Sequence, residues 1–277
     1  MTGWEEMNSI SLGVVAALAG LLIGSFLNVC VYRLPRLTNR SVVTPRSRCW
    51  RCRAPIAWYD NIPILSYVLL GGRCRNCKRI IPVRYPLVEA ATAMAFAVCV
   101  TKLGISVPAL KYLTFSSILI SLMATDFERH ILPDEFTIGG TVLGLIFAVL
   151  VPMDPYVISI LLPHGLNERI YSVSEAAVGA FFSSGVIWLM GYVYGRLRNV
   201  DALGFGDVKM IAMIGAFLGL AGALQTMVLG SAVGAVVGLA YIVVARKNWR
   251  TYLIPFGTFL GAAGLFVALY GEVLRGR

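Results

Sequence analysis

The sequence predicts an all-α polytopic membrane protein with about eight transmembrane helices and a small zinc-ribbon-like cytoplasmic domain between the first two. Apolar residues make up 58% of the 277 residues, charged residues make up 14%, and the mean hydropathy is +0.77. Soluble domains do not combine these values. Apolar stretches of transmembrane length recur along the chain, and one polar loop holds half of the basic residues and four of the six cysteines.

Each apolar stretch is long enough to cross a bilayer as a helix. The expected spans lie near residues 9–32, 86–104, 107–125, 136–153, 173–194, 208–224, 226–245 and 253–271. The division within 208–245 is weak, and residues 219–225 must supply the turn there. Acidic residues rather than basic ones precede the first span, so we expect it to remain as an anchor and not to be cleaved as a signal peptide.

The basic residues predict the orientation of the chain in the membrane. Twelve Lys and Arg residues lie between positions 33 and 84, against the single acid Asp60, so this loop is expected in the cytoplasm. Counting crossings places 126–135, 195–207 and 246–252 on the same side and 151–172 outside. Attraction of the loop to anionic lipid explains the net charge of +10. We therefore expect membrane lipids, and no nucleic acid, as partners.

Four cysteines indicate a metal centre in this loop. Cys49-x-x-Cys52 and Cys74-x-x-Cys77 are separated by the 21 residues 53–73, a little longer than the usual zinc-ribbon spacing but of the same form. A domain of about 50 residues buries little apolar surface, and structural zinc would stabilise its fold. Two disulfides or four free thiols are the alternatives, and cytoplasmic thiols stay reduced. The predicted organisation is a first transmembrane helix at 1–33, a cytoplasmic four-cysteine domain at 34–85 and a transmembrane domain at 86–277.

Two aspartates at the cytoplasmic ends of different spans are the candidate catalytic residues. Asp126 ends the third span and Asp207 begins the sixth, and acids near the hydrocarbon region are commonly functional or paired. Two carboxyl groups that share a proton titrate as a unit. The ionised group can take a proton from water while the protonated group donates to the scissile carbonyl oxygen, which hydrolyses a peptide without metal or covalent intermediate.

The residues before Asp207 strengthen this reading. Gly204 and Gly206 give a backbone that can adopt unusual φ values and can admit an extended peptide without a Cβ clash, and the helix start favours an ionised Asp207. The structural alternatives are that Asp207 only caps its helix and that Asp126 is a solvated loop acid close to Arg129.

These residues belong to a longer pattern that resembles the bifunctional type IV prepilin leader peptidases with N-methyltransferase activity, membrane aspartic proteases of the Gly-x-Gly-Asp type. The matching stretches are residues 24–35, 47–52, 58–63, 72–77, 84–89, 126–134, 204–209 and 254–257. The resemblance implies catalytic roles for Asp126 and Asp207. It also implies that prepilins or pseudopilins are cleaved at the cytoplasmic face of the bacterial inner membrane. The new N-terminus, commonly phenylalanine, would then be methylated from S-adenosylmethionine.

The chain departs from that pattern at two positions. Trp50 stands where proline is usual in the first Cys-x-x-Cys, and Thr258 follows the motif at 254–257 where proline is common. Neither residue is expected to touch a catalytic atom, so we expect activity to survive. Asp134 is the rival of Asp126, but the match favours Asp126, and Asp134 after Pro133 is placed to cap the next helix.

The methyl-donor site rests on the resemblance alone, because no Gly-x-Gly-x-x-Gly unit indicates a Rossmann pocket. Its candidates are Asn28, Tyr32, Arg33 and Gly72. Substrate contacts are expected from Gly204, Gly206, Lys209 and Asp134. Glu89 is read as structural, near the start of the second span and paired with Arg84.

Two other functions remain open at this point. A protease-only enzyme resembling preflagellin peptidases would lack the cysteine-rich loop. A proton or cation transporter using the acids would tend to show internal repeats, and none is found.

Overall fold

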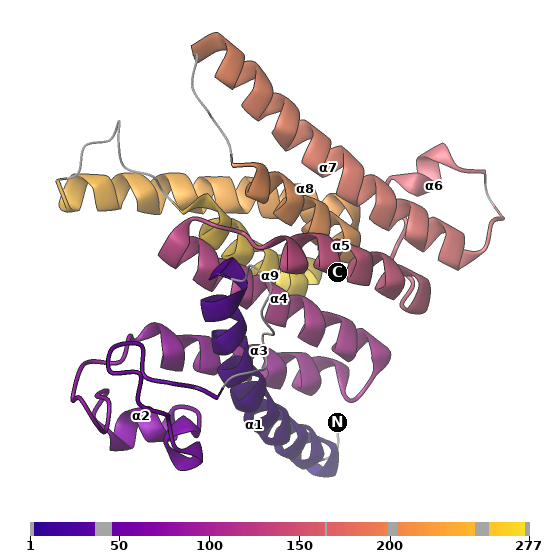
Figure 1. Cartoon of the computed structure of the whole chain (residues 1–277). Coiled ribbons are helices and arrows are strands. Elements are labelled where there is room, and N and C mark those ends of the chain that lie inside the picture. Colours follow the sequence, from indigo (N-terminus) through magenta and orange to yellow (C-terminus); the bar gives the residue numbers. More distant parts are fainter. Residues whose placement is uncertain (1–2, 37–45, 164, 199–203, 247–254, 275–277) are drawn as a thin grey trace. The chain divides into compact units, whose positions relative to one another are not determined.

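The computed structural model describes residues 3–36, 46–163, 165–198, 204–246 and 255–274 (Figure 1). Parts of two expected cytoplasmic loops, at 199–203 and 247–252, lie outside these residues, as do the start of the last expected span and residue 254 of the motif at 254–257. The described residues form nine α-helices, two 3-10 segments and no strand, which confirms the all-α class. They divide into two compact units, Met1–Ala124 and Thr125–Arg277.

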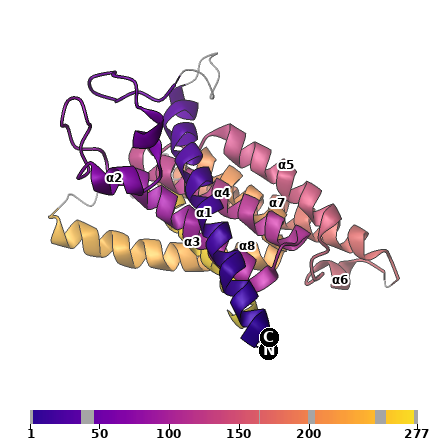
Figure 2. The same ribbon diagram turned by 90° about the horizontal axis from the view of Figure 1, so that it is seen from below.

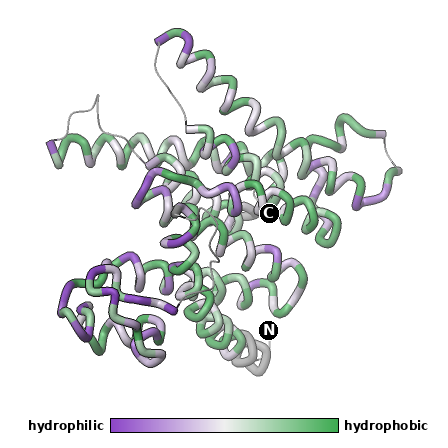
Figure 3. Tube along the Cα trace, in the orientation of Figure 1, coloured by the Kyte–Doolittle hydropathy of each residue, from purple (hydrophilic) through white to green (hydrophobic). Residues whose placement is uncertain are grey.

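Five helices are long and apolar enough to cross a membrane. They are α1 (Gly3–Arg33), α3 (Arg84–Leu103), α4 (Val107–Arg129), α7 (Glu168–Arg198) and α8 (Phe205–Val244). The helices α5 (Asp134–Leu150) and α9 (Phe256–Leu274) are shorter and equally apolar in character. Apolar residues run along the helices, whereas hydrophilic residues gather in 46–83 and at helix ends (Figure 3). The protein is therefore a multi-pass membrane protein.

In the first unit, α1 packs along α3 because small residues let the two backbones approach. A Cβ at Gly20 would lie 2.7 Å from the Ala93 Cα, and one at Gly24 would lie 2.8 Å from the Glu89 Cα. The C-terminal end of α1 continues into η1 (Leu34–Arg36). The segment 46–83, which contains η2 (Trp58–Asn61) and α2 (Leu65–Leu69), lies at this end of α1 and away from its N-terminus (Figure 2).

In the second unit, α8 packs against α5, α7 and α9. The closest approach is to α7, where a Cβ at Gly179 would lie 2.6 Å from the carbonyl carbon of Gly219 and 2.7 Å from the Gly215 oxygen. Any side chain at this crossing would separate the two helices. The short helix α6 (Ile158–Leu161) lies on α7.

The turn expected at 219–225 is confined to one residue. Gly219 has φ 71° and ψ −177°, a backbone that favours glycine, and the chain is helical on both sides of it. The two halves of α8 correspond to the sixth and seventh expected spans, and the other six spans each correspond to one helix. A single glycine suffices because a carboxylate from α7 accepts a hydrogen bond from the restarted helix.

That carboxylate is Glu175, which sequence reasoning did not single out. It is 2% exposed, and its Oε1 accepts the Leu220 N–H at 3.3 Å. Its Oε2 accepts the Val157 and Ile158 N–H groups, each at 3.2 Å, at the start of α6. A buried helix start needs such acceptors, and a negative charge is favourable there.

Candidate active site and metal centre

The structure brings Asp126 and Asp207 together in the second unit. Asp126 lies in the last turn of α4 and is 5% exposed, while Asp207 lies in the first turn of α8 and is partly exposed. The backbone of Gly257, at the start of α9, runs against both side chains. A Cβ on Gly257 would lie 3.1 Å from the Asp126 Oδ2 and 3.2 Å from the Asp207 Oδ1.

Those two distances limit the separation of the carboxyl groups. Both oxygens lie close to the position that a Gly257 Cβ would take, so the distance between them cannot exceed the sum of those two distances. A single water molecule that makes two hydrogen bonds of about 2.6–3.2 Å spans the same range. Gly257 belongs to the motif at 254–257, but sequence reasoning gave it no role. Its function is spatial, because any side chain at this position would press against both acids.

Thr258 holds Asp126 in place, which corrects the expectation that it touches no catalytic atom. The Thr258 N–H donates to the Asp126 Oδ2 at 2.7 Å, and its hydroxyl donates to the same oxygen at 3.0 Å. Thr258 is the third residue of α9, where backbone N–H groups have no partner within the helix. The Asp126 carboxylate therefore caps α9, and its reading as a solvated loop acid is wrong.

The glycines before Asp207 act differently from the expectation. Gly204 has φ −67° and ψ 129°, an ordinary extended conformation, and Gly206 is helical. Neither is among the positive-φ glycines, so unusual φ values are not the reason for them. Space is the reason, since a Cβ at Gly206 would lie 3.1 Å from the Leu132 side chain and one at Gly204 would lie 3.3 Å from the Asp207 Oδ2.

Asp134 does not join the pair of acids. It is the first residue of α5, its side chain is 58% exposed, and its Oδ1 binds the Lys209 Nζ at 2.7 Å. The N-cap position belongs to Pro133, so the expected capping role of Asp134 is wrong. Two of the expected substrate contacts, Asp134 and Lys209, thus form an exposed ion pair.

The four cysteines of the first unit form a cluster of the expected kind. The sulfur atoms of Cys49, Cys52, Cys74 and Cys77 all lie within 4.8 Å of one another, and the Cys49 and Cys77 sulfurs are 3.9 Å apart. Tetrahedral zinc with Zn–S bonds of about 2.3 Å spaces its sulfurs about 3.8 Å apart. The four thiols are free, so the disulfide alternative is wrong. The residues therefore fit a zinc ion.

Two matching turns present these sulfurs. The Cys49 N–H donates to the Ala54 oxygen and the Cys74 N–H donates to the Arg79 oxygen, each at 2.9 Å. The residue after each second cysteine, Arg53 or Lys78, has a positive φ, 58° and 56° respectively. The segment therefore contains the same local structure twice, which the cysteine spacing alone does not reveal because neither position is a glycine.

Backbone N–H groups in these turns favour thiolate. Those of Cys77 and Asn76 lower the pKa of the Cys74 thiol to about 7, and the Ala54 N–H lowers the pKa of Cys52. Burial raises the pKa of Cys49 to about 11. Because a thiolate is the metal-binding form, a cation is the group that would hold Cys49 deprotonated beside its neighbours.

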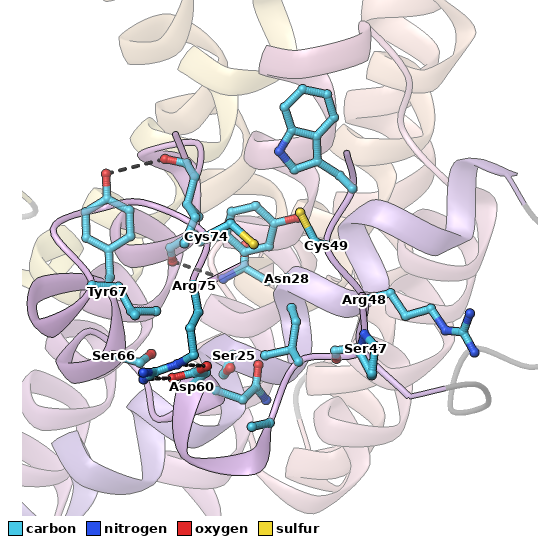
Figure 4. Close-up of a pocket in the computed structure, with 18 of the residues that line it drawn as sticks. Ser25, Asn28, Ser47, Arg48, Cys49, Asp60, Ser66, Tyr67, Cys74 and Arg75 are labelled. Carbon is cyan, nitrogen blue, oxygen red and sulfur yellow. Dashed lines mark hydrogen bonds and ion pairs between the residues drawn. The ribbon is translucent and has the colours of Figure 1, made fainter. Parts of the chain in front are cut away.

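A pocket of about 760 Å³ lies in the first unit and shares a wall with the cysteine cluster (Figure 4). Asn28, Tyr32 and Arg33 line it together with Cys49 and Cys74. Three of the four methyl-donor candidates are thus brought together. The fourth, Gly72, is not in the lining but lies against Tyr67, which is. A Cβ at Gly72 would lie 3.0 Å from the Tyr67 Oη, and the φ of Gly72 is +65°.

Asn28 is a buried polar residue of this pocket. It is 2% exposed, and its Nδ2 donates to the Tyr85 oxygen at 3.0 Å. Its Oδ1 is buried with no hydrogen-bond partner among the described residues. A buried acceptor without a partner is costly. A ligand that offers a donor at this point would remove the cost.

Two further contacts shape the pocket, and sequence reasoning missed both. Arg75 donates to both carboxylate oxygens of Asp60, Nε at 2.8 Å and Nη2 at 2.7 Å, and this hydrogen bonding lowers the pKa of Asp60. Glu89 is 7% exposed, and its Oε2 accepts the N–H of Ile64 at 2.8 Å. Ile64 has φ 58°. Glu89 is structural as expected, but it holds a strained loop residue.

These features define a multi-pass helical membrane protein with a paired-aspartate site in one unit and a four-cysteine centre beside a pocket in the other. Residues 18–103 match the Bacterial Peptidase A24 N-terminal domain, and residues 113–239 match the Type IV leader peptidase family. The chain belongs to the type IV leader peptidase family, which confirms the resemblance found in its motifs.

Known relatives support the same family assignment. A prepilin leader peptidase/N-methyltransferase of Pseudomonas putida is 34% identical, with 93% of this chain and 90% of that protein aligned. One of Aeromonas salmonicida is 32% identical over 92% of this chain and 89% of its own length. One of Myxococcus xanthus is 37% identical over 84% of this chain and 64% of its own length. No solved structure matches the chain.

Proposed function

We propose that this protein is an aspartic endopeptidase that removes the leader peptide of type IV prepilins or pseudopilins and then methylates the new N-terminus. The observation that supports the peptidase half is the approach of the Asp126 and Asp207 carboxyl groups to the same point on the backbone of Gly257, at 3.1 and 3.2 Å from its Cβ position. The family and its relatives' names support the substrate class and the second activity.

The peptidase reaction needs one proton on the pair of acids. The ionised carboxylate takes a proton from a water molecule, whose oxygen bonds to the scissile carbonyl carbon. The protonated carboxyl group gives its proton to the carbonyl oxygen. As the intermediate collapses, the carbon–nitrogen bond breaks, the first acid donates its new proton to the leaving amine, and the second acid recovers a proton from the hydroxyl group.

The surroundings of the pair suit an extended substrate. Gly204 and Gly257 keep side chains away from the two acids, and Gly206 lets the start of α8 approach Leu132. An unwound segment of a prepilin could therefore reach the carboxyl groups with little steric hindrance. In the bacterial inner membrane, the positive-inside rule predicts that this opening faces the cytoplasm. We also propose that residues 34–85 form a cytoplasmic domain and that residues 86–277 carry the peptidase.

The methyltransferase half is assigned to the pocket of the first unit. Its volume of about 760 Å³ lies within the range of small-molecule sites, and S-adenosylmethionine would supply a methyl group bound to a positively charged sulfur. Asn28 would accept a hydrogen bond from this ligand through its unpartnered Oδ1, and Tyr32 and Arg33 would line its cavity. Zinc held by the four cysteines would fix the wall formed by Cys49 and Cys74.

Purified protein, reconstituted in detergent micelles or nanodiscs with a synthetic prepilin, tests the peptidase half. Asp126→Asn and Asp207→Asn should each reduce leader removal by about 10³-fold or more, because general acid–base catalysis of this kind contributes about 10²–10⁴-fold. Asp134→Asn is the matched control and should keep at least a third of the wild-type rate. Full activity in Asp126→Asn would defeat the assignment.

A pre-cleaved pilin peptide and labelled S-adenosylmethionine test the second half separately. Wild-type protein and both aspartate variants should transfer the label to the N-terminal amine. Asn28→Leu removes the hydrogen bond proposed between its Oδ1 and the ligand, together with the bond from its Nδ2 to the Tyr85 oxygen. It should weaken methyl-donor binding by about tenfold or more and should leave leader removal intact. Cleavage without any transfer by the wild type would remove the methyltransferase half alone.

A further inference from the structure

Thr258 provides the Asp126 carboxylate with two hydrogen-bond donors. Two donors of Thr258, its backbone N–H at 2.7 Å and its hydroxyl at 3.0 Å, converge on the Asp126 Oδ2. The same oxygen lies at the start of α9, where the helix dipole favours negative charge. Hydrogen bonds donated to a carboxylate stabilise its ionised form. Burial opposes a negative charge on either acid, but these contacts favour the ionised form of Asp126 more than that of Asp207.

No comparable donor serves Asp207 within the described residues. Its backbone N–H donates to the Gly204 oxygen at 3.0 Å, and the neighbours of its carboxyl oxygens are the backbones of Gly204 and Gly257. The start of its own helix favours negative charge, as the sequence suggested. With Asp126 already ionised close by, the single proton of the pair is better placed on Asp207.

Few other charges face the pair. Asp126 experiences Asp207 from α8 and His130 just after α4. The first turn of α9 brings no titratable side chain, since Pro255 precedes Phe256, Gly257 and Thr258. At the start of α5, Asp134 is engaged by Lys209. The asymmetry within the pair therefore comes mainly from Thr258.

We propose that Thr258 is a positioning residue that makes Asp126 the base of the pair, leaves the proton on Asp207, and thereby sets the acidic limit of leader cleavage. This rests on the proposed peptidase function. Asp126 would take the proton from water and Asp207 would protonate the scissile carbonyl oxygen. A proline at this position would have no N–H and no hydroxyl group to donate.

The pH dependence of kcat and kcat/KM for leader removal tests the proposal. Thr258→Val keeps the shape and the N–H but removes the hydroxyl donor. In this variant the acidic limb of both profiles should move to higher pH by about one unit, as expected for a lost hydrogen bond to a charged group. KM on the plateau should be unchanged, since Thr258 contacts the carboxylate and not the substrate.

Two further variants sharpen the test. Thr258→Ser restores the hydroxyl donor and should return the acidic limb to its wild-type position, which a role in packing alone would not predict. Thr258→Pro removes both donors and should move the limb at least as far as valine does. Thr141→Val is the matched control, because the Thr141 hydroxyl only donates to the Thr137 oxygen of its own helix, and its profile should coincide with the wild type.

An acidic limb that stays within about 0.2 pH units of the wild type in an active Thr258→Val protein would overturn the proposal, and so would a serine variant that behaves like valine. Both results would leave the peptidase assignment standing. If the wild type cleaves the leader but Asp126→Asn cleaves it equally well, the proposed function fails instead, so the two failures are distinguishable.

Discussion

The two units of the molecule present polar chemistry on apolar helices by different means. In the first unit the reactive groups are neighbours in sequence, since each turn carries two cysteines and the N–H groups that act on them. In the second unit the groups come from distant positions, and Asp126 and Thr258 are 132 residues apart. A site of local origin is visible in sequence spacing, whereas a site assembled from helix ends depends on how the helices pack.

The second unit also shows what separates a structural carboxylate from a candidate catalytic one. Glu175 and Asp126 are both buried acids that accept N–H groups from the start of another helix. Glu175 accepts three N–H groups and faces backbone around it. Asp126 has a second acid, Asp207, against the same Gly257 backbone. The same capping interaction therefore leaves Glu175 among backbone N–H groups and Asp126 beside a second acid with which it could share a proton.

Among changes that leave both acids in place, Gly257→Ala is expected to have the largest effect on one unit alone. A methyl group there would lie 3.1 to 3.2 Å from both acids and would displace them, and a misplacement of about 1 Å can cost about 100-fold in rate. Leader removal should fall by about that factor while methyl transfer to a pre-cleaved peptide is unchanged. Gly139→Ala, at a position with nothing within 4 Å of the new Cβ, is the control. Equal cleavage rates would contradict the geometry.

Removal of the zinc ion that we propose for the four cysteines should affect the first unit and largely spare the second. A chelator, or Cys49→Ser, should release the wall that Cys49 and Cys74 give to the pocket, and loss of groups that support a metal site typically costs about 10–100-fold. Methyl-donor binding, measured by calorimetry, should weaken by about tenfold or more. Leader removal should change less than threefold. Loss of both activities together would contradict the assignment of the two activities to different units.

Glu175 offers a test within the second unit. Glu175→Leu leaves three N–H groups, two of them buried, without an acceptor, so the free energy of unfolding should fall by about 2–4 kcal/mol. Cleavage per folded molecule should fall no more than about threefold. Glu175→Gln, which keeps one acceptor oxygen, should lose less stability. Thermal unfolding measures the stability, and active-site titration gives the cleavage rate per folded molecule. A large loss of rate at unchanged stability would show that Glu175 takes part in catalysis.

The features that the sequence predicts correctly are those set by residues close together in the chain. The spans follow from hydropathy, and the four-cysteine cluster follows from spacing. The turn at Gly219 was placed within the range 219–225 but not at one residue, because its geometry depends on Glu175 from another helix. Glu175 could have been noticed as an acid inside the expected span 173–194. Thr258 was noted as a departure, but no sequence signal names its partner on α4.

The smallest effect is expected from Asp134→Asn, and it bears on the choice between the two aspartates near the α4 end. Asp134 is exposed and paired with Lys209 at 2.7 Å, and exposed ion pairs contribute about 0–1 kcal/mol. Leader removal and stability should both change little, with a rate within about twofold to threefold of the wild type. Raising the salt concentration should reduce even this difference, because it screens an exposed pair. If Asp134→Asn instead abolished cleavage at an unchanged unfolding temperature, the second acid of the site would have to be sought at the start of α5, and the contact of Asp126 with Thr258 would be reduced to a helix cap of the same kind as Glu175.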